Sequence, residues 1–364
     1  NQVMDDLGNF PYLATYGTNS SYNYLINGSK PVIVKAPGLV APDFTWETVT
    51  QMDFGFDASF LNNRLTGTFD WYRRNTKDML VAGATLPATL GASVPKSNSA
   101  DMKTIGWELS LGWNDRLENG FSYWVKGVLS DYQATITKYA GNDAGFYSQS
   151  DGDGKYYVGQ KIGEIWGYHS NGLFQSDDEA ATIDQSELYA GKWGAGDVKY
   201  EDLDNDGKIT KGEETIYNPG DKSIIGNKTP RYQFGITVGF DYKNFDFEMF
   251  WQGTGKRDYM LSGAQFWGFT SQWDVPYTPA LDYWTETNTD AYFPRPGWQN
   301  GGNRVTSDRY LQSAAYGRLK NLTVGYTIPK NLTTKWGISR LRLYVTGENL
   351  LTITPLNDAF DPET

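Results

Sequence analysis

The chain has 364 residues, a formal net charge of −11 and no cysteine. The acidic charge, without any stripe rich in lysine and arginine, argues against a nucleic-acid partner, and the lack of cysteine excludes disulfides, thiolate metal sites and a cysteine nucleophile. The sequence contains no run of eighteen apolar residues, so it predicts no transmembrane helix. Aromatic residues make up 15% of the chain.

Eight segments alternate apolar and polar residues for about ten positions each. In the first, apolar residues occupy the even positions from Met52 to Phe60, and aspartate, glycine and serine lie between them. A strict period of two fits a strand with lipid on one face and water on the other, and it does not fit a helix. The pattern predicts strands at residues 47–60, 65–78, 102–114, 121–138, 231–243, 245–258, 313–328 and 339–353.

The connections between these strands alternate between short and long. Short turns are predicted at residues 61–64, 115–120, 243–244 and 329–338, and long loops near residues 1–46, 79–101, 139–230 and 259–312. Outer-membrane barrels place short turns in the periplasm and long loops outside the cell. The sequence therefore predicts an all-β, antiparallel transmembrane barrel whose first strand descends from the outside. Because both chain ends then fall on the long-loop side, we expect a slice of a larger barrel, with a closed eight-stranded barrel as the alternative.

The apolar parity of each strand predicts which side chains face lipid. They are Phe54, Phe56, Phe69, Trp71, Trp107, Leu109, Phe234, Ile236 and Val238. The polar parity is expected to face the lumen and includes Asp53, Asp57, Asp70, Glu108, Lys126 and Glu248.

Six blocks of sequence are distinctive along the chain. They are FTWE (Phe44–Glu47) with the segment Phe54–Leu80, KIGEIWGY (Lys161–Tyr168), GDVKYEDLDNDGKIT (Gly196–Thr210), the segment Ile224–Phe247, GRLKNLTVGYTIP (Gly317–Pro329) and LRLYVTGENLLTIT (Leu341–Thr354). In this order they resemble the C-terminal half of the SusC/RagA family of TonB-dependent outer-membrane transporters of Bacteroidetes.

The resemblance implies a barrel of about twenty-two strands with a plugged lumen, of which residues 1–364 would form a C-terminal part with about eight strands. The plug domain and the TonB box would lie upstream of this chain. The implied function is TonB-dependent nutrient import through the outer membrane, with an oligosaccharide or an oligopeptide as substrate. The implied partners are TonB, acting through the plug, and a SusD-like surface lipoprotein that caps the barrel.

The segment DLDNDGKITKGE (Asp202–Glu213) fits the twelve-position calcium loop, with glycine at position six. Calcium takes six to eight oxygen ligands, and clustered carboxylates repel one another without a cation. No helix is predicted on either side, so we expect a calcium loop grafted into a surface loop, with a solvated acidic turn as the alternative. The predicted ligands are Asp202, Asp204, Asp206, Lys208 through its backbone carbonyl, and Glu213.

The long loops are rich in aromatic residues. Trp267, Trp273, Trp284 and Trp298 are candidates to face a substrate or a partner protein. The favoured interpretation is that such residues form the cores of ordered loops, because a loop of this length must bury something to be ordered. We also predict that loops 139–230 and 259–312 form the docking surface for the SusD-like lid.

Other polar groups give weaker signals. His169 is the single histidine, and without a second histidine or a cysteine it is expected to serve in loop packing. The acidic residues Asp151, Asp153, Asp177, Asp178 and Glu179 match no ligand spacing, which favours a solvated loop. We therefore predict no enzymatic activity. A structural or adhesive barrel, or an outer-membrane enzyme that uses the acidic loops, are the alternative functions.

Overall fold

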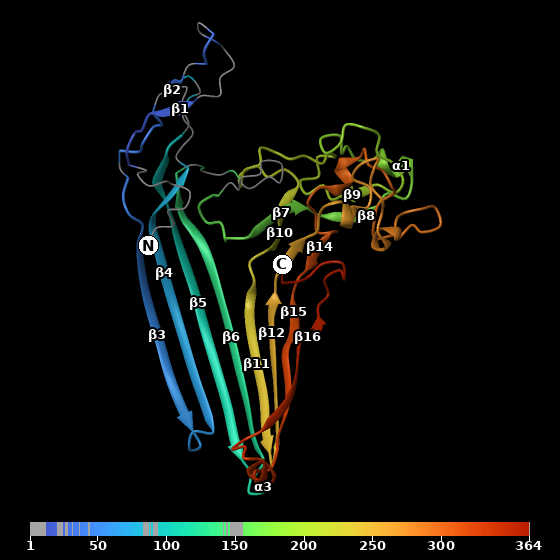
Figure 1. Cartoon of the computed structure of the whole chain (residues 1–364). Coiled ribbons are helices and arrows are strands. Elements are labelled where there is room, and N and C mark those ends of the chain that lie inside the picture. The colour runs from blue at the N-terminus through green and yellow to red at the C-terminus, as the bar shows by residue number, and fades with distance from the viewer. Residues whose placement is uncertain are drawn as a thin grey trace.

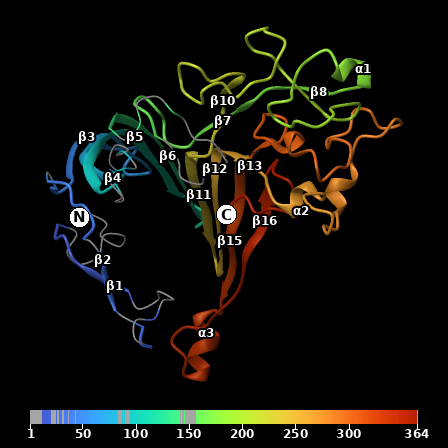
Figure 2. The same ribbon diagram turned by 90° about the horizontal axis from the view of Figure 1, so that it is seen from above.

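The main feature of the computed structural model is one curved antiparallel sheet of eight strands, in which each strand pairs with the next along the chain (Figures 1 and 2). The strands are β3 (Thr48–Phe60), β4 (Leu65–Ala82), β5 (Lys96–Arg116), β6 (Ser122–Tyr139), β11 (Arg231–Tyr242), β12 (Phe245–Lys256), β15 (Tyr316–Thr327) and β16 (Arg342–Ile353). The structure describes residues 12–19, 25, 28–30, 32–35, 37–42, 44–82, 87, 89, 94–140, 142, 145 and 156–363. The predicted all-β antiparallel wall is confirmed.

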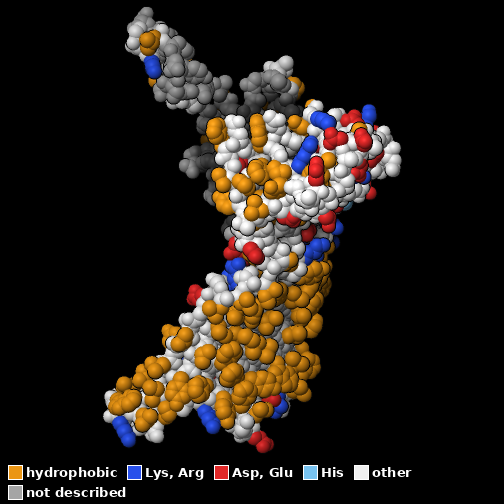
Figure 3. Space-filling view, turned by 90° about the vertical axis from the view of Figure 1, so that its right-hand side faces the viewer, with side chains coloured by type: hydrophobic (Ala, Val, Ile, Leu, Met, Phe, Trp, Pro, Cys, Tyr) orange, Lys and Arg blue, Asp and Glu red, His pale blue; other side chains and the backbone are white. Residues whose placement is uncertain are grey.

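The strand register separates an apolar face from a polar face. Phe56 lies opposite Phe69, which lies opposite Leu109 on the next strand. Leu109 continues through Leu129 to Phe234, so the row crosses five strands without a polar residue. All nine side chains predicted to face lipid share this face. Figure 3 shows hydrophobic side chains gathered in a broad band over the wall.

The strands differ in length. The strands β4, β5 and β6 have 18, 21 and 18 residues, whereas β11, β12, β15 and β16 have 12 each. The predicted loop at 79–101 was too long, because residues 79–82 and 96–101 continue the β4–β5 ladder. Register shifts near Met79, next to Asp78 with φ 57°, break the alternation that sequence analysis relies on. The long strands rise above the short ones in Figure 1.

The two longest connections fold together above the wall. We call residues 156–227 and 257–315 the loop unit. It contains β7 (Glu164–Tyr168) paired with β10 (Lys222–Asn227), β8 (Ser170–Leu173) paired with β9 (Val198–Tyr200), β13 (Asp258–Met260) paired with β14 (Leu311–Ser313), and the short helices α1 (Asp177–Ala180), α2 (Ala264–Trp267), η2 (Thr278–Leu281) and η3 (Gly301–Arg304). A separate pair, β1 (Gly17–Asn19) and β2 (Ile33–Lys35), lies near the N-terminus.

The loop unit has a hydrophobic core of its own. Its buried side chains come from both connections, with Leu356 added from the segment after β16, and include Tyr168, Leu173, Val198, Tyr200, Ile209, Leu261, Phe266, Trp267, Phe293 and Tyr310. A shared core means that neither connection is ordered independently of the other. Short turns join the strands at the opposite end of the wall, and the last of them contains α3 (Lys330–Thr333) and η4 (Thr334–Trp336). No helix in the described part of the chain is long and apolar enough to cross a membrane.

Candidate functional site: the loop unit

A buried carboxylate joins the two halves of the loop unit. Asp197, which precedes β9, accepts hydrogen bonds from the Arg295 guanidinium at 3.0 and 2.6 Å and from the Asn303 amide at 2.8 Å. The backbone N–H of Gly194 adds a further bond at 2.9 Å. A buried charge is tolerated only when it is paired and hydrogen-bonded, as here. Since these partners lie about a hundred residues apart in sequence, the cluster fixes the two connections to each other.

Tyrosines complete this contact inside the core. The Tyr200 hydroxyl donates to the carbonyl of Gly302 at 2.7 Å. Burial raises the pKa of Tyr200 well above its usual value, so the phenol stays neutral and remains a donor. Burial likewise raises the pKa of Tyr168 and of Tyr310. The phenols of Tyr168 and Tyr200 therefore act as structural donors, to the carbonyls of Thr210 and Gly302.

The single histidine has two partners that sequence analysis did not find. Its Nδ1 lies 2.7 Å from a carboxylate oxygen of Asp308, and its Nε2 lies 2.6 Å from the Ser223 hydroxyl. The order of groups is that of a serine hydrolase triad. Asp308 also accepts the N–H of Ser170 at 2.9 Å, and Ser223 lies inside β10. The three residues join the first connection to the second, which agrees with the predicted role of His169 in loop packing.

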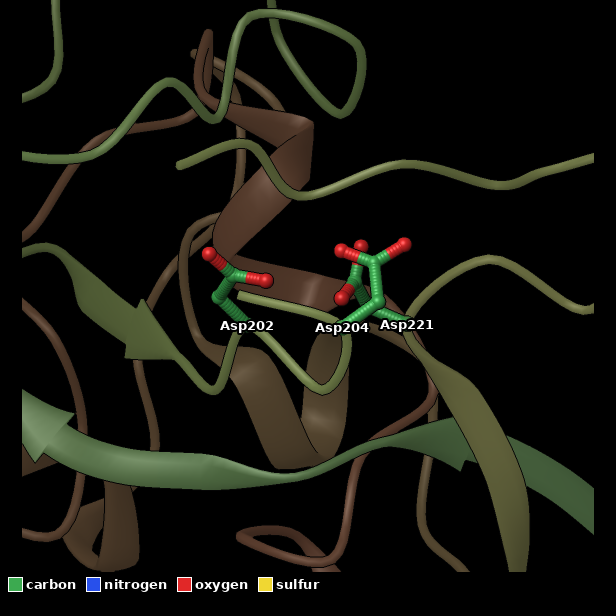
Figure 4. A group of neighbouring side chains, drawn as sticks. All are labelled: Asp202, Asp204 and Asp221. Atoms are coloured by element: carbon green, nitrogen blue, oxygen red, sulfur yellow. The ribbon is translucent and has the colours of Figure 1, made fainter. Parts of the chain in front are cut away.

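Three carboxylates meet in the acidic segment, as Figure 4 shows. Asp202 and Asp204 lie with Asp221 so that one oxygen of each falls within 4.8 Å of the others. Partial desolvation raises the pKa of Asp202, but hydrogen bonds from the N–H groups of Gly207, Asn205 and Asp206 outweigh it and leave this pKa below its usual value. Desolvation and the charges of neighbouring aspartates raise the pKa of Asp204. The carboxylates therefore repel one another, and a cation would relieve that repulsion.

The remaining predicted ligands lie outside this group. Asp206 accepts the N–H of Lys208 at 2.8 Å, and Glu213 is exposed. Asp221 was not predicted, because it lies beyond the twelve-position motif. It is buried and accepts the N–H groups of Leu203 and Thr210 at 2.8 and 2.7 Å.

Two glycines explain how Asp221 reaches the motif. Gly212 and Gly220 have φ values of 57° and 59°, and they approach so closely that a Cβ on Gly220 would lie 2.5 Å from the Gly212 nitrogen. The left-handed backbone and the close approach both require glycine. The chain between these glycines turns back on itself and places Asp221 beside Asp202. A Gly–Asp pair soon after the motif was the available signal.

The four candidate tryptophans divide into two pairs. Trp267 is 8% exposed and lies in the core, and Trp284 packs against that core. Trp273 is 83% exposed and Trp298 is 46% exposed. The core interpretation therefore holds for the first pair, and the second pair remains available to a partner or a substrate.

The exposed Trp273 is held in a fixed turn. The Asp274 carboxylate accepts the N–H groups of Thr270 and Ser271, each at 2.8 Å. The hydrogen bond from the Thr270 hydroxyl is the largest of the contacts that lower the pKa of Asp274. The turn is thus charged and hydrogen-bonded at neutral pH, and Trp273 forms an exposed apolar surface together with Val275, Tyr277 and Leu281.

The inner face of the wall carries two neighbouring cavities. One of about 400 Å³ is lined by Gln233, Gln252 and Tyr316, and another of about 330 Å³ by Asp70 and Glu108. Both also touch Val128 and Ser130, so they adjoin across the middle of the sheet. The polar side chains of this lining, which lie among apolar ones, offer hydrogen-bond donors and acceptors to a molecule inside the barrel.

The family model described as "TonB dependent receptor-like, beta-barrel" matches residues 5–350. The chain belongs to the TonB-dependent receptor family. TonB-dependent receptor P3 of Formosa agariphila is 30% identical over 375 residues, covering 97% of this chain and 34% of that protein. TonB-dependent receptor SusC of Bacteroides thetaiotaomicron is 26% identical over 358 residues, covering 97% of this chain and 33% of that protein.

Solved structures of the RagAB peptide importer share the fold. The "open-open" state superposes with a TM-score of 0.73 at 20% identity, covering 98% of this chain and 36% of that chain. The structure of the RagAB peptide transporter superposes with a TM-score of 0.72 at 21% identity, covering 97% of this chain and 36% of that chain. The chain spans about a third of the length of the curated relatives that it matches.

These comparisons confirm the resemblance to SusC/RagA proteins and place the barrel in the outer membrane. The members of this TonB-dependent receptor family that match are receptors and transporters, and they are not enzymes. The apolar face of the wall is therefore its lipid face, and the short turns lie on the periplasmic side.

Proposed function

We propose that this chain forms wall and outer loops of an importer that takes up an oligosaccharide or an oligopeptide through the outer membrane, driven by TonB. In this proposal a SusD-like surface lipoprotein docks on the loop unit as a lid. The proposal is supported by family membership and by one observation above all. The loop unit is rigid, with a core and a buried Asp197 cluster, yet it leaves large apolar side chains such as Trp273 in water.

Rigid exposed aromatics favour protein docking. Tryptophan and tyrosine dominate the binding energy of protein interfaces, since they bury a large area at little cost in side-chain entropy. Trp273, Val275 and Tyr277 lie within five residues of one another and are 83%, 78% and 56% exposed. Hydrogen bonds of Asp274 and Ser271 hold the turn that carries Trp273, which lowers the cost of ordering this side chain on binding.

The polar inner cavities support passage of a hydrogen-bonding substrate below the lid. Amide and tyrosine side chains suit the hydroxyl groups of a sugar and the backbone of a peptide equally well. RagAB, which has this fold, is described as a peptide transporter. Growth of a strain lacking the whole gene, on oligosaccharides or on oligopeptides as sole nutrient, separates the two classes. Unchanged growth and uptake on both would contradict import.

Docking of the lid can be tested by removing the exposed aromatics. We expect Trp273→Ala with Tyr277→Ala to weaken lipoprotein binding by on the order of thirtyfold for each side chain removed, since each hot-spot side chain contributes about 2 kcal/mol. The measurement is co-purification from native outer membranes, with the partner identified by mass spectrometry as a SusD-like lipoprotein. Leu117→Ala, at an exposed periplasmic turn, is the matched control. Equal recovery of the lipoprotein with both variants would show that the lid binds elsewhere.

We also propose that the acidic segment binds calcium. Asp202, Asp204 and Asp221 would supply carboxylate oxygens, and the other predicted ligands Asp206, Lys208 and Glu213 would complete the shell on binding. Calcium supplies a divalent charge that stabilises the segment and takes part in no chemical step.

The calcium proposal predicts a loss of binding when one carboxylate is removed. Asp204→Ala should weaken calcium binding at least tenfold, because it removes a ligand and its charge, while the barrel stays folded. Isothermal titration calorimetry of the full protein with calcium chloride measures the affinity. Asp178→Ala makes the same charge change at another exposed position of the loop unit. An absence of heat at millimolar calcium, or equal affinity in both variants, would exclude the site.

A further inference from the structure

The periplasmic turn between β15 and β16 is unusually elaborate. It covers residues 328–341, whereas residues 243–244 alone join β11 to β12. It contains α3 and η4, and Gly337 ends η4 with φ 70°. Joining two neighbouring antiparallel strands requires only about two to five residues. The additional residues therefore call for another explanation.

This turn is ordered and yet exposes its apolar side chains. Thr333 is fully buried, and the N–H of Ile338 donates to its carbonyl at 3.0 Å. In the same turn Leu332 is 42% exposed, Trp336 is 58% exposed and Ile338 is 39% exposed. The backbone bonds hold the turn together, and within this chain these three side chains are exposed. Three exposed apolar side chains in one turn indicate an apolar patch that contacts a membrane or another protein.

The charges of the turn have one sign. Lys330, Lys335 and Arg340 are exposed, and residues 328–341 contain neither aspartate nor glutamate. None of the three forms an ion pair with a residue that the structure describes, whereas Arg342 on the adjoining strand pairs with Asp246. The chain as a whole is acidic, with a formal net charge of −11. A basic, apolar turn thus stands out against an acidic protein and favours an anionic partner.

The place of the turn identifies that partner. The turn lies at the periplasmic end of the wall, and Figure 3 shows Lys and Arg side chains, together with some Asp and Glu side chains, along the lower margin of the hydrophobic band. In a bilayer this margin is the level of the lipid headgroups, where tryptophan and lysine are preferred. The charge and the apolar surface both match an anionic phospholipid, with its phosphate beside its acyl chains.

We propose that residues 330–340 bind anionic phospholipid headgroups in the periplasmic leaflet. Leu332, Trp336 and Ile338 enter the boundary between headgroups and acyl chains. Lys330, Lys335 and Arg340 contact the phosphate groups and draw anionic lipid to this part of the wall. The turn thereby fixes the height of β15 and β16 in the membrane.

Lipid binding can be measured by native mass spectrometry of the full protein from its native gene. Phosphatidylglycerol and phosphatidylcholine are titrated separately into the protein in detergent. We expect Lys330→Gln with Lys335→Gln to weaken phosphatidylglycerol binding by about twenty-five-fold, since each basic residue near an anionic surface contributes roughly fivefold. Lys192→Gln with Lys211→Gln is the matched control, because both lysines are exposed in the loop unit. Equal binding of the two lipids, or equal loss in both double variants, would overturn the proposal.

A second measurement locates the turn directly. A nitroxide label on Ser339→Cys is read by paramagnetic resonance in phosphatidylglycerol-containing bilayers, in a protein that otherwise has no cysteine in this chain. If the label is more accessible to oxygen than to a water-soluble nickel reagent, it lies at the lipid interface, as expected. Preferential access to nickel would place the turn in water. Protection from both reagents would show that another protein segment covers it, and either result would overturn the proposal.

Discussion

Leu109→Lys should destabilise the barrel by about 2 to 4 kcal/mol, because it places a charge near the middle of the lipid face. Leu109 lies between Phe69 and Leu129 in the apolar row. The quantity is the free energy of unfolding of the full protein from lipid vesicles, measured by urea titration. The neighbouring Ser110→Lys is the matched control, since Ser110 has similar partial burial but lies on the polar face between Thr68 and Val128.

The control should change stability by much less, because its ammonium group points to the water-filled side and lies near Asp70 and Glu108. Equal destabilisation by the two lysines would mean that both faces are equally apolar in the membrane. A larger effect of Ser110→Lys would mean that the register is inverted. Both outcomes contradict the assignment of faces.

Phe266→Ala should destabilise the loop unit by about 3 to 5 kcal/mol, as expected for a buried phenylalanine replaced by alanine. Phe266 is 1% exposed, and its ring centroid lies 5.0 Å from that of Trp267 and 5.2 Å from that of Phe293. The measurement is amide hydrogen exchange, which reports local opening. Exchange should accelerate at Phe174 and Arg295 alike, since their N–H groups are bonded within this unit.

Val275→Ala is the control for this experiment, because Val275 is exposed and its truncation leaves no cavity. The wall should keep its slow exchange in both variants. If Phe266→Ala accelerated exchange in only one of the two connections, their common core would not act as one cooperative unit. That result would contradict the mutual dependence inferred from the buried contacts.

The wall was predictable because lipid imposes its pattern on every second residue. Across β11 the predicted and observed strands differ by a single residue at the end, since apolar and polar positions alternate without a break. The prediction failed at the upper ends of β4 and β5, where the bulge near Asp78 removes the alternation. Above the membrane no lipid face selects apolar side chains, so the period of two is lost there.

The loop unit was not predictable in the same way, because its contacts join residues that are distant in sequence. His169 meets Asp308, which lies 139 residues away, and no spacing rule connects them. Trp267 and Trp273 are the same residue type six positions apart, yet one is buried and the other is exposed. Burial in such a loop depends on the path of the whole chain, so local sequence identified the candidates and not their roles.

The unequal strand lengths locate the outer surface of the membrane. At about 3.4 Å per residue and a tilt of about 40°, a strand of 12 residues rises about 30 Å, close to the apolar band of about 25 Å, whereas the 21 residues of β5 rise about 55 Å. Along the lipid face of β5, the last apolar side chain toward the outside is Ile105, and the next on that face is Lys103. On β4 the last apolar side chain is Trp71, and the next is Arg73. The level of the outer headgroups therefore crosses these strands between those residues. Above that level, β4 to β6 continue outside the membrane, where other segments bury Asn98, Ala100 and Ile136. This side of the wall therefore stands higher above the lipid than β11 to β16 do.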